Sequence, residues 1–341
     1  MIRAHRARRI AAAALYGGGG LGLLTAAGYG LLRGEAKLAR RWIGSPTGVP
    51  PSADGVWGIG AGDPIRLAVL GDSSAAGLGV AMAVETPAVL LAIGLSEVAE
   101  RPVRLTNVAV VGARSADLAG QADAVLPGQP QITLIMIGAN DVTGRVPPAQ
   151  SVRALAETVS RLRTAGAEVV VGTCPDLGTI EPIAQPLRLL ARRWSRQMAA
   201  AQTVAVVEAG GRSVSLGDIL GPEFAARPAE MFSRDRFHPS AAGYAAAAAV
   251  MLPSVSAALG LWPEADLPPL PFHREGVAPV ATAAARAAGV AGTEVTPTRV
   301  DGRDRGPRGR WAFLRRRRPR LVDAADGVTW PDASSADSQA G

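Results

Sequence analysis

Short apolar runs of strand length alternate with longer segments of helical spacing between residues 65 and 259, and this alternation limits the fold more than any other feature of the sequence. The strand-like runs are Ile65–Leu70, Val103–Val111, Ile132–Ile137, Glu168–Thr173 and Thr203–Glu208. The helix-like segments are Pro87–Glu100, Ser115–Val125, Pro148–Ala165, Ile183–Ala201 and Ser240–Leu259. Such alternation is typical of a parallel sheet covered by helices on both faces. The sequence therefore predicts an α/β domain over residues 65–262.

The composition is compatible with such a domain and argues against several kinds of site. Of the 341 residues, 48% are hydrophobic, which is enough for one sizeable core, and the formal net charge is +7. The single cysteine, Cys174, excludes an internal disulfide and a cysteine-based zinc site. Of the three histidines only His238 falls within the predicted domain, because His5 and His273 lie in the terminal segments. A metal site built from several histidines is therefore not expected, and a histidine general base has one candidate.

The N-terminal residues 1–44 combine a basic start with an uncharged apolar stretch. Several arginines precede Ile10–Leu32, which carries no charged residue. A bilayer core takes roughly 20 apolar residues, so this stretch is long enough to cross it. The pattern predicts an uncleaved signal anchor, and hence a membrane-anchored or exported protein, with a cleaved signal peptide and a soluble N-terminal helix as alternatives. Positive residues flank both ends of the stretch, so the sequence does not determine its orientation.

Two segments of different composition flank the predicted domain. Residues 45–64 are rich in Pro, Gly and Ser and are predicted to form a linker. Residues 263–341 show no steady hydrophobic period and are predicted to be a mostly disordered tail rich in Pro and Arg. Within the tail, the run Arg315–Arg318 follows Trp311 and Phe313, a combination that could bind an anionic membrane face; the alternative is a solvated charged tail. Nucleic-acid binding is not expected, because the basic run lacks a folded recognition element.

The first predicted strand runs directly into Gly71-Asp72-Ser73, a tight turn of small residues. Ligands of open α/β sheets bind at the carboxyl ends of the strands, which is where this turn lies. A serine at this place has an exposed hydroxyl. To act as a nucleophile it needs a general base, a group that orients the base, and donors for an oxyanion. The alternative is a strand that simply ends in an Asp-Ser turn.

Asp235 and His238 are the predicted orienting group and base. They are three residues apart in a loop before the last predicted helix, so one turn can present both side chains together. The Asp235 carboxylate could then hold one ring nitrogen of His238 while the other ring nitrogen faces Ser73. The alternative is a surface loop with a partly buried histidine, but no other such pair is available in the predicted domain.

Two residues that follow strands are candidates for oxyanion donors. Gly112 ends the second predicted strand and could offer a bare backbone N–H, and Asn140 follows the third strand and could offer its side-chain amide. The alternative for both is ordinary turn chemistry, because Gly and Asn are favoured in turns. Residues 173–178, after the fourth strand, are expected to line the rim of the site, with Cys174 as a buried small hydrophobe.

Four short blocks, taken together, resemble those of the SGNH hydrolases, also called the GDSL lipase/esterase family. In the family's order they are Gly71-Asp72-Ser73 with Gly77, then Gly112, then Gly138-Ala139-Asn140-Asp141, and finally Asp235 with His238. Each block is weak alone, and the resemblance depends on their order and on their places at strand ends or in loops. It covers residues from about 65 to 260. The first block here reads Gly-Asp-Ser-Ser rather than Gly-Asp-Ser-Leu, a departure that leaves the nucleophile assignment unchanged.

The resemblance implies a three-layer α/β/α sandwich with a flavodoxin-like, five-stranded parallel sheet. It also implies a serine hydrolase that cleaves carboxylic esters through an acyl-enzyme. In that assignment Ser73, His238 and Asp235 are the triad, and the oxyanion hole consists of the Ser73 and Gly112 N–H groups and the Asn140 side chain. No metal or organic cofactor is required, and the expected substrate is a small-molecule or lipid ester. The alternatives are an acyltransferase or thioesterase using the same site, or a catalytically inactive envelope-binding module.

Overall fold

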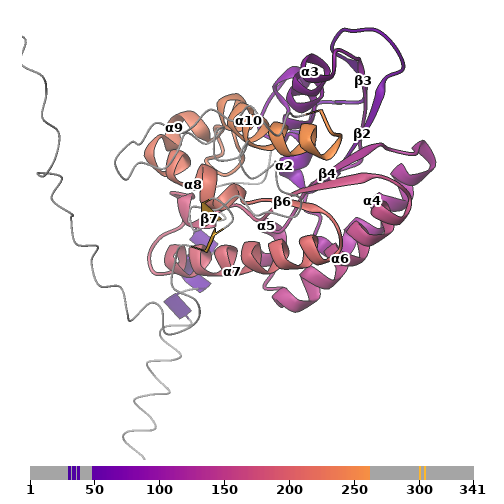
Figure 1. Ribbon diagram of the computed structural model, residues 1–341. Coiled ribbons are helices and arrows are strands. Elements are labelled where there is room, and N and C mark those ends of the chain that lie inside the picture. The colour runs from indigo at the N-terminus through magenta and orange to yellow at the C-terminus, as the bar shows by residue number, and fades with distance from the viewer. Residues whose placement is uncertain are drawn as a thin grey trace, which may run out of the picture. The chain divides into compact units, whose positions relative to one another are not determined.

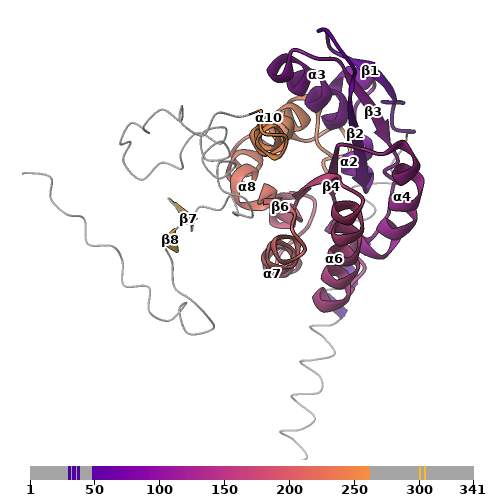
Figure 2. The same ribbon diagram turned by 45° about the vertical axis from the view of Figure 1, so that its right-hand side comes forward.

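The computed structural model describes residues 30–31, 33–35, 37–38 and 48–261, together with the backbone of residues 299–300 and 303–304. Six strands form one mixed sheet in the order β1-β3-β2-β4-β5-β6 (Figures 1 and 2). These strands are β1 (Gly55–Trp57), β2 (Ile65–Gly71), β3 (Val103–Asn107), β4 (Ile132–Met136), β5 (Glu168–Gly172) and β6 (Arg212–Val214). Strands β2 to β6 are parallel, and β1 pairs antiparallel with β3 at one edge. The predicted five-stranded parallel sheet in flavodoxin-like order is therefore confirmed, with one antiparallel edge strand added.

The central strands are buried because helices cover both faces of the sheet. Along β2, Leu67 and Val69 belong to one core cluster, whereas Ala68 and Leu70 belong to a second cluster on the other face. This alternation follows from the two-residue period of a strand, and continuous burial is typical of central parallel strands. In β4 every residue is buried. The sheet thus lies between two apolar cores, as the sandwich requires.

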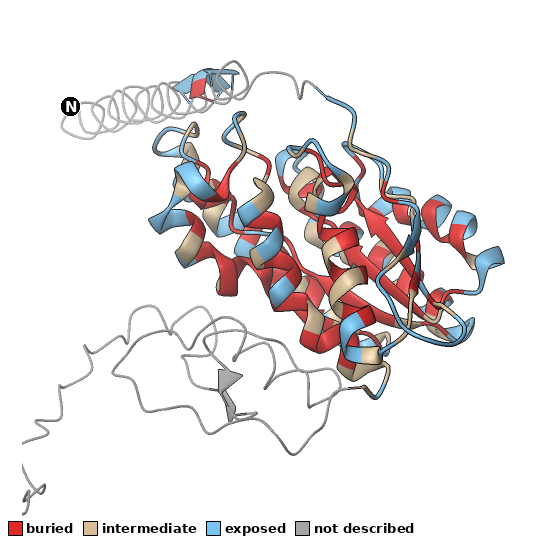
Figure 3. Ribbon diagram, turned by 90° about the horizontal axis from the view of Figure 1, so that it is seen from above, coloured by how far each residue is buried: buried red, intermediate tan, exposed pale blue. Residues whose placement is uncertain are grey.

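The helices form the two outer layers. They are α2 (Ser73–Ala76), α3 (Pro87–Ala99), α4 (Leu118–Val125), α5 (Ala139–Thr143), α6 (Pro148–Thr164), α7 (Leu187–Glu208), α8 (Leu216–Ala226), α9 (Pro228–Met231) and α10 (Ala241–Ala258). Single 3₁₀ turns are η1 (Ala83–Glu85), η2 (Ser115–Asp117), η3 (Leu126–Gly128) and η4 (Leu177–Thr179). Helices α3 and α10 pack together on one face, and α4, α6 and α7 cover the other (Figure 2). Figure 3 shows the buried residues between these layers.

Local sequence explains where α3 and α10, the two helices that pack together on one face of the sheet, begin. The Thr86 hydroxyl accepts a hydrogen bond from Val89 N–H (3.3 Å) at the start of α3, and Pro87 occupies the first helical position. The Ser240 hydroxyl does the same for Gly243 N–H (3.2 Å) at the start of α10. Ser and Thr are favoured at this position because their side-chain oxygens satisfy N–H groups that have no partner within the helix.

The predicted fifth strand, Thr203–Glu208, is wrong: these residues form the last turns of α7, and the fifth parallel strand is β6. Thr and Val favour strands, but Gln202, Thr203 and Val206 are buried on one side of α7, with a helical spacing. Tertiary packing therefore overrides the local preference. The second predicted strand is shorter than expected and ends at Asn107, so Gly112 lies in the following loop.

Two other parts of the fold were absent from the sequence prediction. Strand β1 lies inside the predicted linker 45–64, so the second half of that segment contributes to the sheet. Helices α8 and α9 lie between the last strand and α10, where no element was predicted. Two short strands, β7 (Arg299–Val300) and β8 (Arg303–Asp304), form a separate small sheet in the C-terminal segment.

The predicted signal anchor, except for residues 30 and 31, and most of the predicted tail lie outside the described residues. Just after the anchor, the Glu35 carboxylate accepts a hydrogen bond from Leu187 N–H (3.0 Å) at the start of α7. Among the described residues one helix, α10, is long and apolar enough to cross a membrane, but 56% of it is buried within the protein. We therefore assign α10 to the core.

Candidate active site

Three side chains form a hydrogen-bonded chain at the carboxyl edge of the parallel strands. His238 Nε2 lies 3.0 Å from Ser73 Oγ, and His238 Nδ1 lies 2.6 Å from Asp235 Oδ2. Ser73 is 7% exposed and His238 is 5% exposed, so bulk water has little access to their contact. The fold thus joins a serine and a histidine that are 165 positions apart in the sequence.

The turn after β2 holds Ser73 at the first position of α2. Gly71 has φ = 140°, and a Cβ at this position would collide with the carbonyl oxygen of Met136 on the neighbouring strand β4, so the turn requires glycine. Asp72 N–H donates to the same carbonyl (3.1 Å), and the Asp72 carboxylate accepts from Ser74 N–H (2.9 Å). Asp72 therefore caps α2 and fixes the position of the next residue, Ser73.

The loop after α9 orients His238 through hydrogen bonds to Asp235, which belongs to the same loop. Asp235 Oδ1 accepts hydrogen bonds from Ser233 Oγ (2.7 Å), Phe237 N–H (2.9 Å) and His238 N–H (2.9 Å). The Ser233 N–H in turn donates to the carbonyl of His238 (2.8 Å) and closes the loop. One carboxylate oxygen thus organises the loop, and the other is left to hold the imidazole.

Asn140 lies at the start of α5, directly after β4, and faces the same pocket as Ser73. Its Nδ2 donates to the carbonyl of Ala113 (3.0 Å), which leaves the second N–H of the amide for another acceptor. Gly112 immediately precedes Ala113 in an exposed turn with φ = 84°, and it lines a neighbouring hollow rather than the pocket of Ser73. The fold therefore brings Asn140 close to Ser73 and places Gly112 next to the backbone group that Asn140 contacts.

All of these residues fall within one family match. The model described as "GDSL-like Lipase/Acylhydrolase family" matches residues 69–246. The chain belongs to this family. The GDSL-like esterase Rv1075c of Mycobacterium tuberculosis (strain ATCC 25618 / H37Rv) is 47% identical over 241 residues, a match that covers 67% of this chain and 77% of the relative. The chain described here, as a member of this family, is a carboxylic ester hydrolase.

Solved structures with lower similarity were also found. LAE5, an alpha/beta hydrolase enzyme from the metagenome of Lake Arreo, Spain, is 22% identical, with a TM-score of 0.46 and coverage of 60% of this chain and 97% of that one. TesA is 23% identical, with a TM-score of 0.43 and coverage of 52% of this chain and 91% of that one. A catalytic mutant of Axe2, an acetylxylan esterase from Geobacillus stearothermophilus, is 21% identical, with a TM-score of 0.43 and coverage of 55% and 90%.

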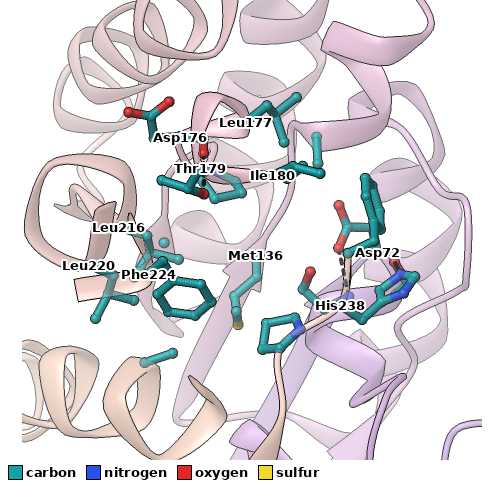
Figure 4. A pocket seen from close by; sticks show the side chains of 18 of the residues that line it. Asp72, Met136, Asp176, Leu177, Thr179, Ile180, Leu216, Leu220, Phe224 and His238 are labelled. Atoms are coloured by element: carbon teal, nitrogen blue, oxygen red, sulfur yellow. Dashed lines mark hydrogen bonds between the residues drawn. The ribbon is translucent and has the colours of Figure 1, made fainter. Parts of the chain in front are cut away.

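The esterase has a pocket that begins at Ser73 and extends between η4, α8 and α10 (Figure 4). Residues Thr173, Pro175, Asp176 and Leu177 line it, as predicted for the rim segment. Cys174 is buried beside them, and burial, followed by the nearby carboxylates, raises the pKa of its thiol well above the ordinary value. A neutral, buried thiol agrees with the prediction that Cys174 is a small hydrophobe rather than a reactive group.

The two carboxylates that flank the site have opposite electrostatic properties. Burial raises the pKa of Asp72 to about 6, and the hydrogen bond from Ser74 N–H only partly offsets this effect. Burial also opposes ionisation of Asp235, but the hydrogen bonds from His238, Phe237 N–H and Ser233 outweigh it and hold the pKa of Asp235 well below its ordinary value. Asp235 is therefore the carboxylate that stays charged beside the imidazole, whereas Asp72 is near its titration point at mildly acidic pH.

Three residues position the site in ways that the sequence analysis did not assign. Ser233 donates to Asp235, and the buried Asp141 accepts hydrogen bonds from Ser115 N–H (3.1 Å) and Ser151 Oγ (2.7 Å), which anchors the start of α5. At Gly79 a Cβ would lie 3.1 Å from that of His238, so the loop after α2 packs directly against the histidine. Gly79 and Asp141 lie in or beside the recognised blocks, whereas no motif marks Ser233.

Proposed function

We propose that Ser73, His238 and Asp235 form the catalytic triad of this esterase and that ester hydrolysis proceeds through an acyl-enzyme. The observation that carries the proposal is the pair of contacts on the imidazole, 3.0 Å to Ser73 Oγ on one side and 2.6 Å to Asp235 Oδ2 on the other. This arrangement supports a base that accepts the hydroxyl proton at Nε2 while Nδ1–H stays on the carboxylate side.

In the acylation step, Nε2 of His238 takes the Ser73 hydroxyl proton as Oγ forms a bond to the acyl carbon. The carbonyl oxygen becomes an oxyanion, and we assign its stabilisation to the Ser73 N–H and to Nδ2 of Asn140, since both residues line the pocket. The Gly112 N–H is kept as the third donor on the family resemblance alone, because Gly112 lines the neighbouring hollow. Ser73 supports this role because it occupies the first position of α2, where the helix itself supplies no acceptor for its N–H. Collapse of the intermediate breaks the bond to the alcohol oxygen, which takes its proton from the imidazolium.

In the deacylation step, water replaces the alcohol. His238 Nε2 removes a proton from the water molecule, whose oxygen forms a bond to the acyl carbon. The second tetrahedral intermediate then breaks the bond to Ser73 Oγ, and Oγ takes the proton back. The products are a carboxylic acid and the free serine. Asp235 keeps the imidazole in one orientation through both steps and stabilises its charged form.

A fluorophosphonate probe tests the proposal, since it reacts only with an activated serine. We expect labelling to map to Ser73, and we expect the Ser73→Ala variant to lose both labelling and hydrolysis of p-nitrophenyl acetate. The matched control is Ser160→Ala, because Ser160 is an exposed serine on α6. Full activity of Ser73→Ala, or labelling of a different residue in the active wild type, would overturn the triad.

We further propose that Ile10–Leu32 anchors the enzyme at a membrane of the cell envelope. The stretch carries no charge and follows a basic N-terminus. Fractionation of cells expressing the full chain should place activity with the membranes, and replacing two central leucines, Leu23 and Leu24, by arginine should release it. Activity that stays soluble with the unchanged chain would reject the anchor.

A further inference from the structure

The pocket beyond Ser73 is apolar at its far end. Figure 4 shows Leu216, Leu220 and Phe224 of α8 together at the side opposite His238, with Met136 between the two sides. Leu177 and Ile180, around η4, line another wall. All of these side chains are buried in the folded protein. The far end therefore offers carbon surface to a ligand, and such surface favours an apolar group.

The polar side chains that line this part of the pocket already have partners in the protein. Tyr244 donates its hydroxyl to the carbonyl of Leu78 (2.6 Å), and Thr179 donates to the carbonyl of Asp176 (2.8 Å). The Asp176 carboxylate accepts from Gly178 N–H (2.8 Å) and lies 3.2 Å from Arg192 Nε. A sugar hydroxyl placed there would have to displace one of these contacts or stay unpaired, and an unpaired buried hydroxyl is costly.

The far wall packs closely against the rest of the fold. A Cβ on Gly217 of α8 would lie 3.1 Å from Asp176 N and 3.2 Å from the carbonyl oxygen of Cys174, so the helix backbone rests on the segment after β5. Phe224 packs edge-on against Phe232, with ring centroids 4.9 Å apart. The pocket therefore has a closed end, and a linear chain that enters from Ser73 meets this wall.

The two halves of an ester make different demands on such a pocket. The acyl group is bonded to Ser73 from the end of acylation until deacylation, whereas the alcohol must leave and water must reach His238 from solvent in between. A buried pocket with a closed end is therefore better suited to the acyl group than to the alcohol.

We infer that this pocket binds the acyl chain of the substrate, that the chain is linear, apolar and longer than acetyl, and that Leu220 and Phe224 set its maximum length. The inference rests on the proposed acyl-enzyme at Ser73 and goes beyond it by assigning the substrate class. Each methylene that enters the pocket should raise kcat/KM by about fourfold until the chain reaches the wall of α8.

The test is a series of p-nitrophenyl esters in which only the acyl group changes: acetate, butyrate, octanoate and palmitate. For the wild type we expect butyrate to exceed acetate by at least about fivefold in kcat/KM, and palmitate to fall well below the best substrate. In Leu220→Trp the octanoate-to-acetate ratio should fall at least about tenfold, and in Leu220→Ala the best chain length should increase. The matched control, Leu189→Trp, changes a leucine that is 64% exposed on α7 and should leave the ratio unchanged.

Three outcomes overturn the acyl assignment. The first is a wild-type enzyme that prefers acetate. The second is an octanoate-to-acetate ratio that changes in neither Leu220 variant although thermal melts show both to be folded. The third comes from a series of alkyl acetates: if kcat/KM rises more steeply with alcohol length than with acyl length, the pocket binds the alcohol. If Leu220→Trp does not fold, Leu220→Ala alone decides, because it enlarges the pocket. Loss of the triad proposal is distinguishable, since it would appear as fluorophosphonate labelling outside Ser73 whatever the chain-length profile.

Discussion

The two ends of the pocket differ in both chemistry and origin. At the Ser73 end, polar groups contact one another within 3.0 Å and come from segments as much as 165 residues apart. At the α8 end, the wall is mainly hydrocarbon side chains from α8 and the segment around η4, and the polar side chains there are paired within the protein. We infer that the groups at the Ser73 end carry out the reaction and that the α8 end selects the acyl group of the substrate. Mutations at the two ends should therefore change different kinetic parameters.

The largest effect is expected from His238→Ala, which removes the proposed general base at the polar end. We expect kcat to fall by at least about a thousandfold, because the Ser73 hydroxyl then has no group to accept its proton. The loss should be similar for acetate and octanoate esters, since the apolar end is unchanged. Steady-state kinetics on both esters check this. A loss confined to one chain length would contradict the separation of the two ends.

The next largest effect is expected from Asn140→Ala. Removing one oxyanion donor typically lowers kcat by about 10²–10³ fold, and Asn140 is the proposed side-chain donor and lines the pocket of Ser73. Single-turnover measurements should show slower acylation, while KM changes little. A reduction of less than about threefold would remove Asn140 from the oxyanion hole and leave the two backbone N–H groups.

Asp72→Asn should change stability in a pH-dependent way. Because burial raises the pKa of Asp72 from 3.8 to about 6, the folded state holds its proton more tightly than the unfolded chain does. Ionisation therefore costs stability as pH rises from about 4 to 6, by at most about 3 kcal/mol. An asparagine can still accept from Ser74 N–H and avoids this cost.

The measurement is the free energy of unfolding of wild type and Asp72→Asn at pH 8 and pH 4. The variant should be the more stable of the two at pH 8, and the difference should shrink toward zero at pH 4. Asp63→Asn is the matched control, because Asp63 is exposed before β2. Equal stability of wild type and variant at pH 8 would mean that the Asp72 carboxylate is not destabilised in the folded protein.

The smallest effect is expected from Ser233→Ala, which removes one of the hydrogen bonds to Asp235 Oδ1. Phe237 N–H and His238 N–H remain, so the loop should keep its shape and the free energy of unfolding at pH 7 should fall by about 1 kcal/mol. We expect kcat to fall only a few-fold. The kcat of Asp235→Asn is the reference for this comparison. If kcat falls equally in the two variants, Ser233 itself is essential for orienting the imidazole of His238.

Acid should weaken the protein through Asp235. Its pKa is held below the ordinary value, so its hydrogen bonds contribute full stability above the unfolded pKa of about 3.9, and this contribution declines as pH falls below that value. Asp72 has the opposite sign over the range between pH 4 and 6. The two carboxylates therefore change stability with opposite sign and in different pH ranges. Measuring the free energy of unfolding against pH for Asp72→Asn and Asp235→Asn separately distinguishes their contributions.

Much of the polar end could be predicted because short motifs mark it. Gly71-Asp72-Ser73 requires glycine for its turn, and Asp235 and His238 are close in sequence, so local geometry constrains both. Ser233 and the partners of Asp141 could not be predicted in this way, because a serine in a loop has no distinctive pattern until its acceptor is known. Gly112 was placed at a strand end, but the strand ends at Asn107. Beyond it Val108 N–H and Val110 N–H still donate to carbonyls of β2, so Gly112 follows an irregular segment that runs beside that strand.

The errors in the fold have a common physical cause. Thr203–Glu208 carries residues that favour strands, yet it continues α7 because Val206 packs into the core on the helical period. Strand β1 is short and lies in a Pro- and Gly-rich segment, so neither its length nor its composition distinguishes it from a linker. In both cases the surrounding structure, rather than the local sequence, decides the conformation.

The amino-acid sequence by itself determined the layered α/β architecture, the family and the positions of the reactive groups, because strand and helix periods and glycine turns depend on neighbouring residues. Only the tertiary structure decided that Ser73 and His238 meet, that Asp72 and Asp235 have opposite pKa shifts, and that α8 closes the apolar end of the pocket. These properties depend on burial and on contacts between distant segments, which no local pattern specifies.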